Sequence, residues 1–530
     1  MSDTAFSPLV QFAMKQPIIS DLIKQPFVSS VLQKSLVQTL LRQPLTYGAY
    51  GAIATTGLFA MIYNDRSIFS EKREKVPFAW PLIGSFPTFA HWVTHLHEIL
   101  GEGFNELDST TYSLNAFCIP HMIFSIHPAN VEHVLKNNFE NYIKGPDFSV
   151  AMDDLFGHGI FNANGEEWKF QRKTASHVFN VKNFRDQFTD VFIEEIKFMS
   201  TNLLDRAAEQ NRIRLGFGVH LNSLHEEEKV PFAVAFDEAQ KGTFFRMINH
   251  YWSVTEPIGT FLAPWLLPNM KAGVKVVDDY ARQVIEQRRT EIAEGKTEAK
   301  DLLSRFMKAS NNEGVPLSND ELRDIVLNFV IAGRDTTAQA LSWCFYMLTT
   351  HPRVEQFLFN EIQEHITDDL LEDSTALYEV IKSKMIYAHA VFFETLRLYP
   401  SVPLNQKYAL HDDILPDGTH IKKGDYFVWS PYAQGRSEKT WGPDAKHFRP
   451  ERWIGDDGDL KRESQGKWPA FHSGPRTCLG QHLATLEALV AIIFLVRKYK
   501  FTLCSGQDIH YQISLTLPMK NGLKLSVEKR

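Results

Sequence analysis

The residues with the clearest chemical potential lie in the segment FHSGPRTCLG, residues 471–480. Cys478 comes just before the mainly apolar pattern QHLATLEALVAIIFLVRKYKF, which predicts a helix that begins beside the cysteine. Unpaired N–H groups and the helix dipole at such a position favour an anionic sulfur. Gly474 with Pro475 predicts a tight turn, and Gly480 allows another group to approach the backbone closely. The segment therefore predicts a thiolate that is held in place to bind a metal.

A second set of reactive side chains lies in AGRDTT, residues 332–337, inside a long helical pattern. Ser318 and Glu321 form a capping box at its start and His351-Pro352 marks its end, so we expect a helix of about 30 residues. The stretch LNFVIAG is apolar on nearly every face, which places the helix in the centre of the protein. Burying an aspartate there without a role costs free energy, whereas the adjacent threonine can bond back to a carbonyl one turn earlier.

Segment 471–480 resembles the haem-binding signature of the cytochromes P450, and three further motifs of that family occur in the family's order. The resemblance implies haem b with Cys478 as the axial ligand of the iron. It also implies that Phe471 and Gly480 belong to the haem-binding loop and that Arg476 meets a haem propionate. A guanidinium group is well suited to pair with a carboxylate.

The other motifs imply further roles by the same resemblance. Trp168 and Arg172 in NGEEWKFQRK are similar to the WxxxR element that contacts haem propionates. Glu394 and Arg397 of ETLR, with Arg452 of FRPERW, resemble the structural triad that holds the cysteine loop in place.

The hexapeptide AGRDTT resembles the family's acid–alcohol pair, which relays protons while dioxygen is activated at the iron. The resemblance assigns this catalytic role to Asp335 and Thr336, and Gly333 would leave room for the oxygen. Proton delivery is required because cleavage of the O–O bond consumes two protons while the thiolate supplies electron density.

Several stretches look closest to the fatty-acid and alkane ω-hydroxylases of fungi and plants, among them ETLRLYPSVP and WGPDAKHFRPERW. Ala332, Val402 and Leu404 occupy positions that line the substrate pocket in such relatives, and all three are apolar. This lining suits the terminal methyl of a hydrocarbon chain, but it suits a steroid, terpene or other polycyclic lipid as well. Some animal fatty-acid hydroxylases of this family carry a glutamate at or near the position of Ala332 that bonds covalently to haem. No carboxylate occurs here between Asp324 and Asp335, so the comparison implies haem held by Cys478 and non-covalent contacts.

Composition limits the possible partners. The formal charge of -7 argues against nucleic acid as the main partner. The four cysteines contain no CxxC pair, which argues against a zinc ribbon or a disulfide framework. No GxGxxG motif follows a predicted strand and no flavin-sized domain is left over, so electrons must come from NADPH through a separate reductase. We expect an NADPH-cytochrome P450 reductase in the same membrane, docking on the face nearest Cys478.

The chain divides into four predicted regions. Residues 1–44 form a tail with an amphipathic stretch, 45–63 an uncharged segment just long enough to cross ~30 Å of hydrocarbon, and 64–87 a charged tether and proline-rich hinge. Residues 88–530 form the catalytic domain, predicted as mainly α with a minor antiparallel β region in its last third. The resemblance implies the P450 fold with a single N-terminal anchor in the endoplasmic reticulum membrane and a cytosolic catalytic domain.

Two local expectations concern the elements around these motifs. The stretch VIKSKMIYAHAVFFETLRLYP predicts one helix that ends at Pro400. The stretch ILPDGTHIKKGDYFVWSPYA, with a Pro-Asp-Gly turn and alternating apolar residues, predicts a small hairpin.

Two other classes of function are alternatives for this sequence. A histidine-box lipid oxidase would need several boxes, but the chain offers only HWVTHLHEI with His91, His95 and His97, which we interpret as the polar side of a helix. A non-oxygenating haem isomerase or dehydratase, or a haem sensor, remains an alternative. Members of the family that abandon dioxygen often lose the acid–alcohol pair, whereas Asp335 and Thr336 are both present, so monooxygenation is favoured.

Overall fold

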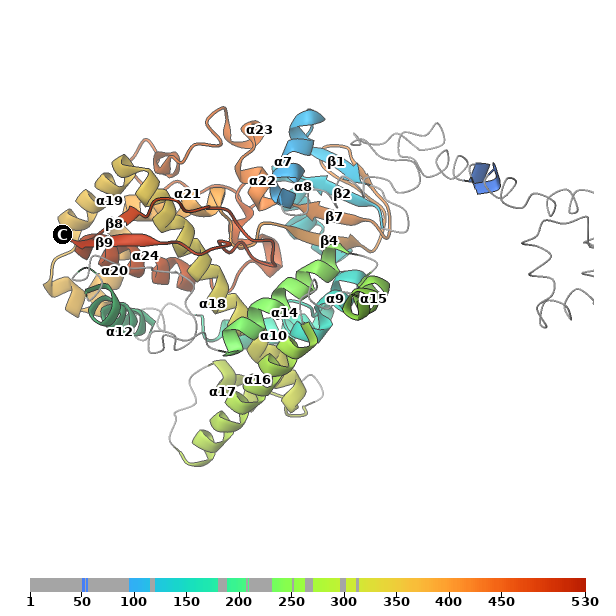
Figure 1. The fold of residues 1–530 in the computed structure, drawn as a ribbon, viewed down its shortest axis with the longest axis horizontal. Helices are drawn as coiled ribbons and strands as arrows, with labels where there is room; N and C mark the ends of the chain where they lie inside the picture. The colour runs from blue at the N-terminus through green and yellow to red at the C-terminus, as the bar shows by residue number, and fades with distance from the viewer. Residues whose placement is uncertain are drawn as a thin grey trace, which may run out of the picture. The chain divides into compact units, whose positions relative to one another are not determined.

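Figure 1 shows the computed structural model, which describes residues 50–52, 54–55, 95–114, 120–179, 188–205, 208, 231–249, 252–262, 270–295, 302–310 and 314–530. The predicted tail and hinge, 1–44 and 64–87, lie outside these residues, and of the predicted span 45–63 only 50–52 and 54–55 are described, as helix. Among the described residues, no helix combines the length and the apolar composition needed to cross a bilayer. The elements belong almost entirely to one compact unit, residues 91–113 with 120–530.

Helices dominate this unit, which confirms the predicted fold class. They are α7 (Leu96–Glu106), α8 (Pro128–Glu132), α9 (Pro146–Phe156), α10 (Gly165–Ser176), α12 (Thr189–Met199), α14 (Pro231–Ile248), α15 (Trp252–Leu262), α16 (Met270–Ala293), α17 (Leu302–Lys308), α18 (Asn319–Thr350), α19 (Pro352–His365), α20 (Ser374–Lys384), α21 (Ile386–Leu398), α22 (Pro431–Gly435), α23 (Glu438–Trp441) and α24 (Gln481–Lys498).

The long helix α18 matches the sequence prediction closely. It has 32 residues, and its N-terminus carries the predicted capping box. The Ser318 hydroxyl accepts from the Glu321 N–H at 3.2 Å, and the Glu321 carboxylate accepts from the Ser318 N–H at 2.8 Å. Figure 1 shows α18 crossing the middle of the unit, with α21 and α24 on one side and α14 and α16 on the other. Its C-terminal half packs with α21 and α24 in the largest apolar core.

The second predicted helix is wrong in one respect, because the chain breaks at Met385 into α20 and α21. The break is stabilised from a distance: the Glu361 carboxylate of α19 accepts from the N–H groups of Tyr387 at 2.6 Å and Ala388 at 2.9 Å. This tertiary cap satisfies donors at the start of α21 that no neighbouring side chain reaches. Burial raises the pKa of Glu361 to about 7, against the opposing effect of these two hydrogen bonds.

The strands form one five-stranded sheet, in the order β1-β2-β7-β4-β3, and two two-stranded sheets, β5-β6 and β8-β9. Their bounds are β1 (Thr111–Leu114), β2 (Met122–Ser125), β3 (Tyr142–Ile143), β4 (Asn405–Ala409), β5 (Asp413–Ile414), β6 (His420–Ile421), β7 (Tyr426–Trp429), β8 (Tyr499–Leu503) and β9 (Leu525–Lys529). The first half of the predicted hairpin is present as antiparallel β5 and β6, with Gly418 at φ +88° in the turn between them. The second half forms β7, which pairs with β2 and β4 in the five-stranded sheet instead.

The larger sheet differs from the expectation of strands only in the last third. Strands β1, β2 and β3 come from the first third of the chain, and β2 pairs with β7 in parallel, whereas β4 pairs antiparallel with both β7 and β3. Four-residue strands such as β1 and β2 are too short to show a clear alternation of apolar and polar residues, so the pattern alone did not reveal them.

The predicted polar helix face at the histidines of α7 is wrong for His97. His95 is exposed and His91 lies outside the described residues, but His97 is buried between the rings of Tyr432 and Tyr511, with centroids 5.5 and 5.1 Å away. Burial, with a smaller contribution from the charge of Arg436, lowers the pKa of His97 to about 3. The side chain is therefore a neutral part of an aromatic core.

Candidate functional site

The cysteine loop is held by a close backbone approach. Gly474 adopts φ +65°, and a Cβ at this position would lie 2.0 Å from the Leu135 carbonyl oxygen, so only glycine fits. The Cys478 N–H donates to the Phe471 carbonyl at 2.9 Å, which closes the loop on itself. Helix α24 begins at Gln481 with Gly480 as its N-cap, so Cys478 lies just before the helix.

The sulfur is less favourably placed for ionisation than the sequence predicts. Cys478 is exposed, but desolvation by the surrounding protein still raises the pKa of its thiol, while a hydrogen bond from the Gly480 N–H and the charge of Arg172 act in the opposite direction. In the protein alone, desolvation outweighs the two stabilising contributions. A metal ion bonded to the sulfur supplies the larger positive charge that makes a coordinating thiol ionise.

The predicted Trp168, Arg172 and Arg476 do come together beside this loop. The guanidinium carbons of Arg476 and Arg172 lie 4.5 and 5.9 Å from the Trp168 ring centroid. Arg476 also donates to the Ala163 carbonyl at 2.7 Å. Its Nε is buried with no hydrogen-bond partner among the described residues.

Three further basic residues belong to the same place and were missed by sequence reasoning: Lys144, Lys407 and His472. Lys407 is fully buried, and its Nζ has no hydrogen-bond partner within the described part of the chain. Burial and then the charges of Lys144 and Arg476 lower the pKa of Lys407 well below its ordinary value. Burial, followed by Arg476, lowers the pKa of Lys144 to about 7. Burial and Lys407 likewise depress the pKa of His472.

We call Lys144, Arg172, Lys407, His472 and Arg476 the basic cluster. None of them forms an ion pair with a carboxylate of the described residues, and the pKa values of Lys144, Lys407 and His472 are lowered partly by the other cations. Buried charges without counter-ions are costly, and buried polar groups normally have partners. The cluster therefore has the donor chemistry to bind an anion with several acceptor oxygens.

The acid and the alcohol of AGRDTT lie on α18 but make different contacts. Asp335 is buried, and its carboxylate accepts from Gln240 Nε2 of α14 at 2.6 Å and lies 3.1 Å from Arg334. Burial raises the pKa of Asp335 to about 6, although the charge of Arg334 and the Gln240 hydrogen bond act against it. The Thr336 hydroxyl donates to the Ala332 carbonyl at 2.8 Å, as its simplest interpretation predicts.

The predicted pocket residues are half-buried and converge on this part of α18. Val402 and Leu404 follow Ser401, whose hydroxyl donates to the Thr336 carbonyl at 2.8 Å and so ties their segment to the helix. Next to Ala332, a Cβ at Gly333 would meet no atom within 4 Å, so the space beside the helix is open there.

Glu394 and Arg397 form a fully buried pair with two hydrogen bonds of 2.7 Å. Arg452, the third member of the predicted triad, makes a weaker contact with Glu394, because its Nε lies 3.6 Å from the carboxylate without a hydrogen bond. Its other guanidinium nitrogens donate to the Trp441 and Asp444 carbonyls. The stronger third partner is Trp453, whose Nε1 donates to Glu394 at 2.9 Å. Sequence reasoning missed Trp453, although it directly follows the arginine of the motif.

The sequence model of the family described as Cytochrome P450 matches residues 75–524. The chain belongs to the cytochrome P450 family. It is 39% identical to cytochrome P450 704C1 of Pinus taeda, an alignment that covers 77% of this chain and 85% of the relative. It is 35% identical to cytochrome P450 704B1 of Arabidopsis thaliana, covering 87% and 96%, and 32% identical to alkane hydroxylase MAH1 of the same plant, covering 85% and 93%.

A cytochrome P450 is a monooxygenase that uses haem iron, dioxygen and electrons supplied by a redox partner to oxidise hydrophobic substrates. The residues of this P450 fit such a cofactor, because haem needs a thiolate for its iron and cations for its two propionates. Cys478 is the thiol, and the basic cluster beside it includes the buried Lys407 and has no carboxylate partner within the described part of the chain.

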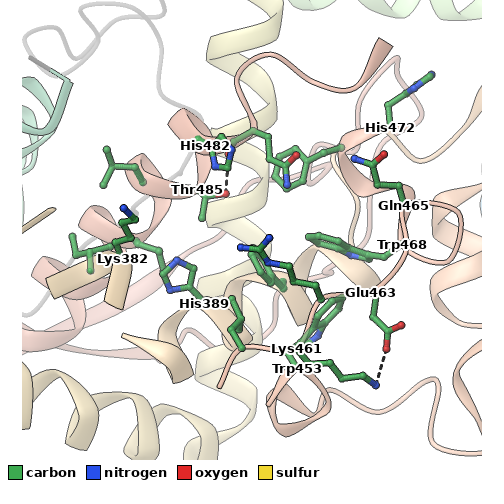
Figure 2. A pocket seen from close by; sticks show the side chains of 18 of the residues that line it. Lys382, His389, Trp453, Lys461, Glu463, Gln465, Trp468, His472, His482 and Thr485 are labelled. Atoms are coloured by element: carbon green, nitrogen blue, oxygen red, sulfur yellow. Dashed lines mark hydrogen bonds and ion pairs between the residues drawn. The ribbon is translucent and has the colours of Figure 1, made fainter. Parts of the chain in front are cut away.

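A pocket of about 560 Å³ lies beside the P450 cysteine loop (Figure 2). Phe471 and His472 of the loop form part of its wall, together with residues of α20, α21, α24 and the segment before the loop. Aromatic rings, including Trp453 and Trp468, share the wall with basic residues such as Lys382. Cys478, Asp335 and Thr336 do not line it, so this pocket is distinct from the region around α18.

The Glu394 contacts predict an order of stability in this P450. Arg397→Ala should lower the free energy of unfolding by about 3–5 kcal/mol, because it leaves a buried carboxylate without its counter-charge. Trp453→Phe removes one hydrogen bond to the same carboxylate and should cost about 1–3 kcal/mol. Chemical denaturation followed by circular dichroism measures both.

Arg449→Ala is the matched control, because its exposed side chain forms an ion pair with Asp444 and with no other described residue, while its backbone N–H still donates to Glu394. We expect a change within about 0.5 kcal/mol. Equal losses for Trp453→Phe and Arg449→Ala would contradict the role of the indole.

Proposed function

We propose that the chain is a haem b monooxygenase that hydroxylates a fatty acid or an alkane at or near its terminal carbon. Cys478 binds the iron, and no covalent bond joins haem to the chain. Trp168, Arg172 and Arg476, with Phe471 and Gly480, hold the cofactor. The observation that carries the haem site is the basic cluster beside Cys478, which includes the fully buried Lys407 and has no carboxylate partner among the described residues, since two propionates would neutralise it.

The substrate proposal is supported by the apolar residues next to the acid–alcohol pair and by the similarity to an alkane hydroxylase. Ala332, Val402 and Leu404 offer a long hydrocarbon only dispersion and hydrophobic contacts. Behind them, α9, α14 and α18 share an apolar cluster that includes Phe236, Leu327 and Ile331. Such a lining favours a chain without polar groups near the carbon that is oxidised.

Asp335 and Thr336 move protons in this proposal. When bound, haem supplies the chemistry of dioxygen activation, which consumes protons on the side of α18. Asp335 has a carboxyl whose pKa, raised by burial to about 6, lets it both take up and give up a proton near neutral pH. The Thr336 hydroxyl, half-buried beside the open space at Gly333, would donate the hydrogen bond that now goes to the Ala332 carbonyl.

Electrons reach the chain from an NADPH-cytochrome P450 reductase, and we place its docking face at the pocket of Figure 2. Support comes from the position of this pocket beside Phe471 and from the basic residues Lys382, Lys461 and Arg462 on its wall. We further propose that residues 45–63 anchor the enzyme in the endoplasmic reticulum membrane with the catalytic domain in the cytosol, on the basis of their uncharged sequence.

The proposed haem site predicts that Lys407→Met weakens haem binding but stabilises the haem-free protein. Haem affinity should fall about 10- to 100-fold, because a charge-assisted hydrogen bond to a propionate is lost. The haem-free protein should become more stable near neutral pH. A lysine whose pKa is depressed on folding loses a proton when the chain folds, and that loss opposes folding at every pH below the ordinary lysine pKa.

Haem titration of the apoprotein and denaturation of the same preparation measure the two effects. Lys500→Met, at an exposed position of β8, should change neither. Unchanged haem affinity in the Lys407 variant would remove this lysine from the haem site.

The proton role predicts that Thr336→Ala leaves substrate affinity unchanged but separates NADPH consumption from product formation. The hydroxyl is replaced by a methyl group in a helix, where alanine is well tolerated, so the fold should persist. The ratio of product to NADPH consumed, measured with the reductase, should fall several-fold while the substrate-binding difference spectrum is retained. A ratio equal to that of the unaltered enzyme would refute the assignment.

The substrate class is tested by difference spectra against fatty acids, alkanes and steroids, followed by product analysis. We expect a long-chain fatty acid or alkane to give the spectral shift and a terminal or near-terminal alcohol. A shift with steroids alone would support the polycyclic-lipid alternative. Rearrangement of a lipid hydroperoxide without NADPH or dioxygen would instead show an isomerase or dehydratase.

A further inference from the structure

The acid of the AGRDTT motif is held from another helix. Gln240 of α14 is 3% exposed and donates from Nε2 to Asp335 Oδ2 at 2.6 Å. The other oxygen of Asp335 lies 3.1 Å from Arg334, its neighbour on α18. Both carboxylate oxygens are thus in contact with a donor on the side of α14, and neither contact involves Thr336.

The contacts around Gln240 show that its amide has no other role within the described residues. Its Oε1 is buried and has no hydrogen-bond partner there. A buried amide with an unsatisfied oxygen costs free energy, so a residue of this type is a poor choice for packing alone. The donated hydrogen bond to Asp335 is the one interaction that an apolar side chain of similar size could not provide.

Within the described residues, the charged groups that act on Asp335 are Arg334 and Asp237. Arg334 belongs to the same helix and also lies 3.3 Å from Asp237 of α14, so its charge is shared between two carboxylates. Burial is the main cause of the raised pKa of Asp335; Arg334 and Gln240 lower it, and Asp237 raises it slightly. The hydrogen bond from Gln240 is therefore one of two interactions that favour the ionised carboxylate.

We propose that Gln240 is a positioning residue for proton delivery: it turns the Asp335 carboxylate toward α14 and favours its ionised form, so that the acid reaches Thr336 only when this hydrogen bond opens. This inference rests on the proposed roles of Asp335 and Thr336. It goes further by making the proton route depend on how α14 lies on α18.

The packing of α14 gives this dependence a physical basis. Phe236 and Ala239, one turn and one residue before Gln240, belong to the apolar cluster that also contains Leu327 and Ile331 of α18. The candidate substrate side of α18 begins one residue later, at Ala332. A substrate that displaces α14 from this cluster would also change the Gln240–Asp335 distance.

The first experiment measures the protonation of Asp335 directly. Infrared difference spectra against Asp335→Asn, recorded over a pH series, follow the carbonyl stretch of the protonated carboxyl. In Gln240→Leu, which keeps the size of the side chain but removes the donor, the midpoint should rise by about one pH unit. Gln240→Glu should raise it further, because two adjacent carboxyl groups resist double ionisation.

Two control variants test whether the shift in the Asp335 midpoint is specific to Gln240. Asp237→Asn should move the midpoint in the opposite direction, since it removes a negative charge and leaves Arg334 to Asp335 alone. Glu238→Gln, on the same helix but paired with Lys241, should leave the midpoint unchanged. An unchanged midpoint in both Gln240 variants, with folded protein shown by circular dichroism, would overturn the proposal.

The second experiment measures the ratio of product to NADPH as a function of pH with the complete enzyme and its reductase. In Gln240→Leu the pH midpoint of this ratio should move upward with that of the carboxyl, while substrate affinity stays within about twofold of the unaltered enzyme. If Asp335→Asn itself leaves the ratio unchanged, the proposed proton role fails. If Asp335→Asn lowers the ratio but Gln240→Leu leaves the pH profile in place, only the inference about Gln240 fails.

Discussion

The structure around the cysteine depends on one buried carboxylate, that of Glu394. It accepts two hydrogen bonds from Arg397, one from Trp453 and one from the Arg449 N–H, so each oxygen has two donors. Arg397 uses its remaining donors on the carbonyl oxygens of Gly435, Ala445 and His447. A buried ion pair repays its desolvation only when its remaining hydrogen bonds are made, and here those bonds go to the chain that leads toward the cysteine loop. The pair therefore fixes the chain between Gly435 and Arg449, in which the four-residue α23 is the one α-helix.

Close backbone packing at two glycines restrains the chain that leads to the cysteine loop, in addition to the Glu394–Arg397 pair. A Cβ at Gly435 would lie 1.9 Å from the Arg397 carbonyl, and one at Gly474 would lie 2.0 Å from that of Leu135. Two short contacts of this kind, one on each side of the segment, leave the loop little freedom to shift. The cost of ordering the loop is thus met by contacts within the protein, and Cys478 is already in place before a metal binds.

The sequence predicted the features that are determined by residues close together in the chain, and it missed most of those that depend on residues far apart. The capping box of α18 spans three residues, and both its bonds are present as expected. The break before α21 escaped prediction because its cap, Glu361, belongs to another helix. Lys407 and Lys144 escaped for a similar reason: each looks like a surface lysine in the sequence, and only the fold places it next to Arg476. Family resemblance named the arginines of the site but not Gln240, whose partner is 95 positions away.

The charges on the two sides of α18 are arranged for different tasks. On the side of the cysteine loop, the charge of Arg476 helps to lower the pKa values of Lys144 and Lys407, and none of the three forms an ion pair with a carboxylate of the described residues. Any group that brings two carboxylates and a metal removes this repulsion, so its binding stabilises the folded chain by linkage. On the side of α14, Arg334 lies between Asp237 and Asp335, and burial is the main cause of the raised pKa of Asp335, with a smaller contribution from Asp237. The excess of positive charge beside the cysteine loop thus suits the retention of an anionic cofactor. The paired charges beside Asp335 suit an acid that must take up and release protons repeatedly.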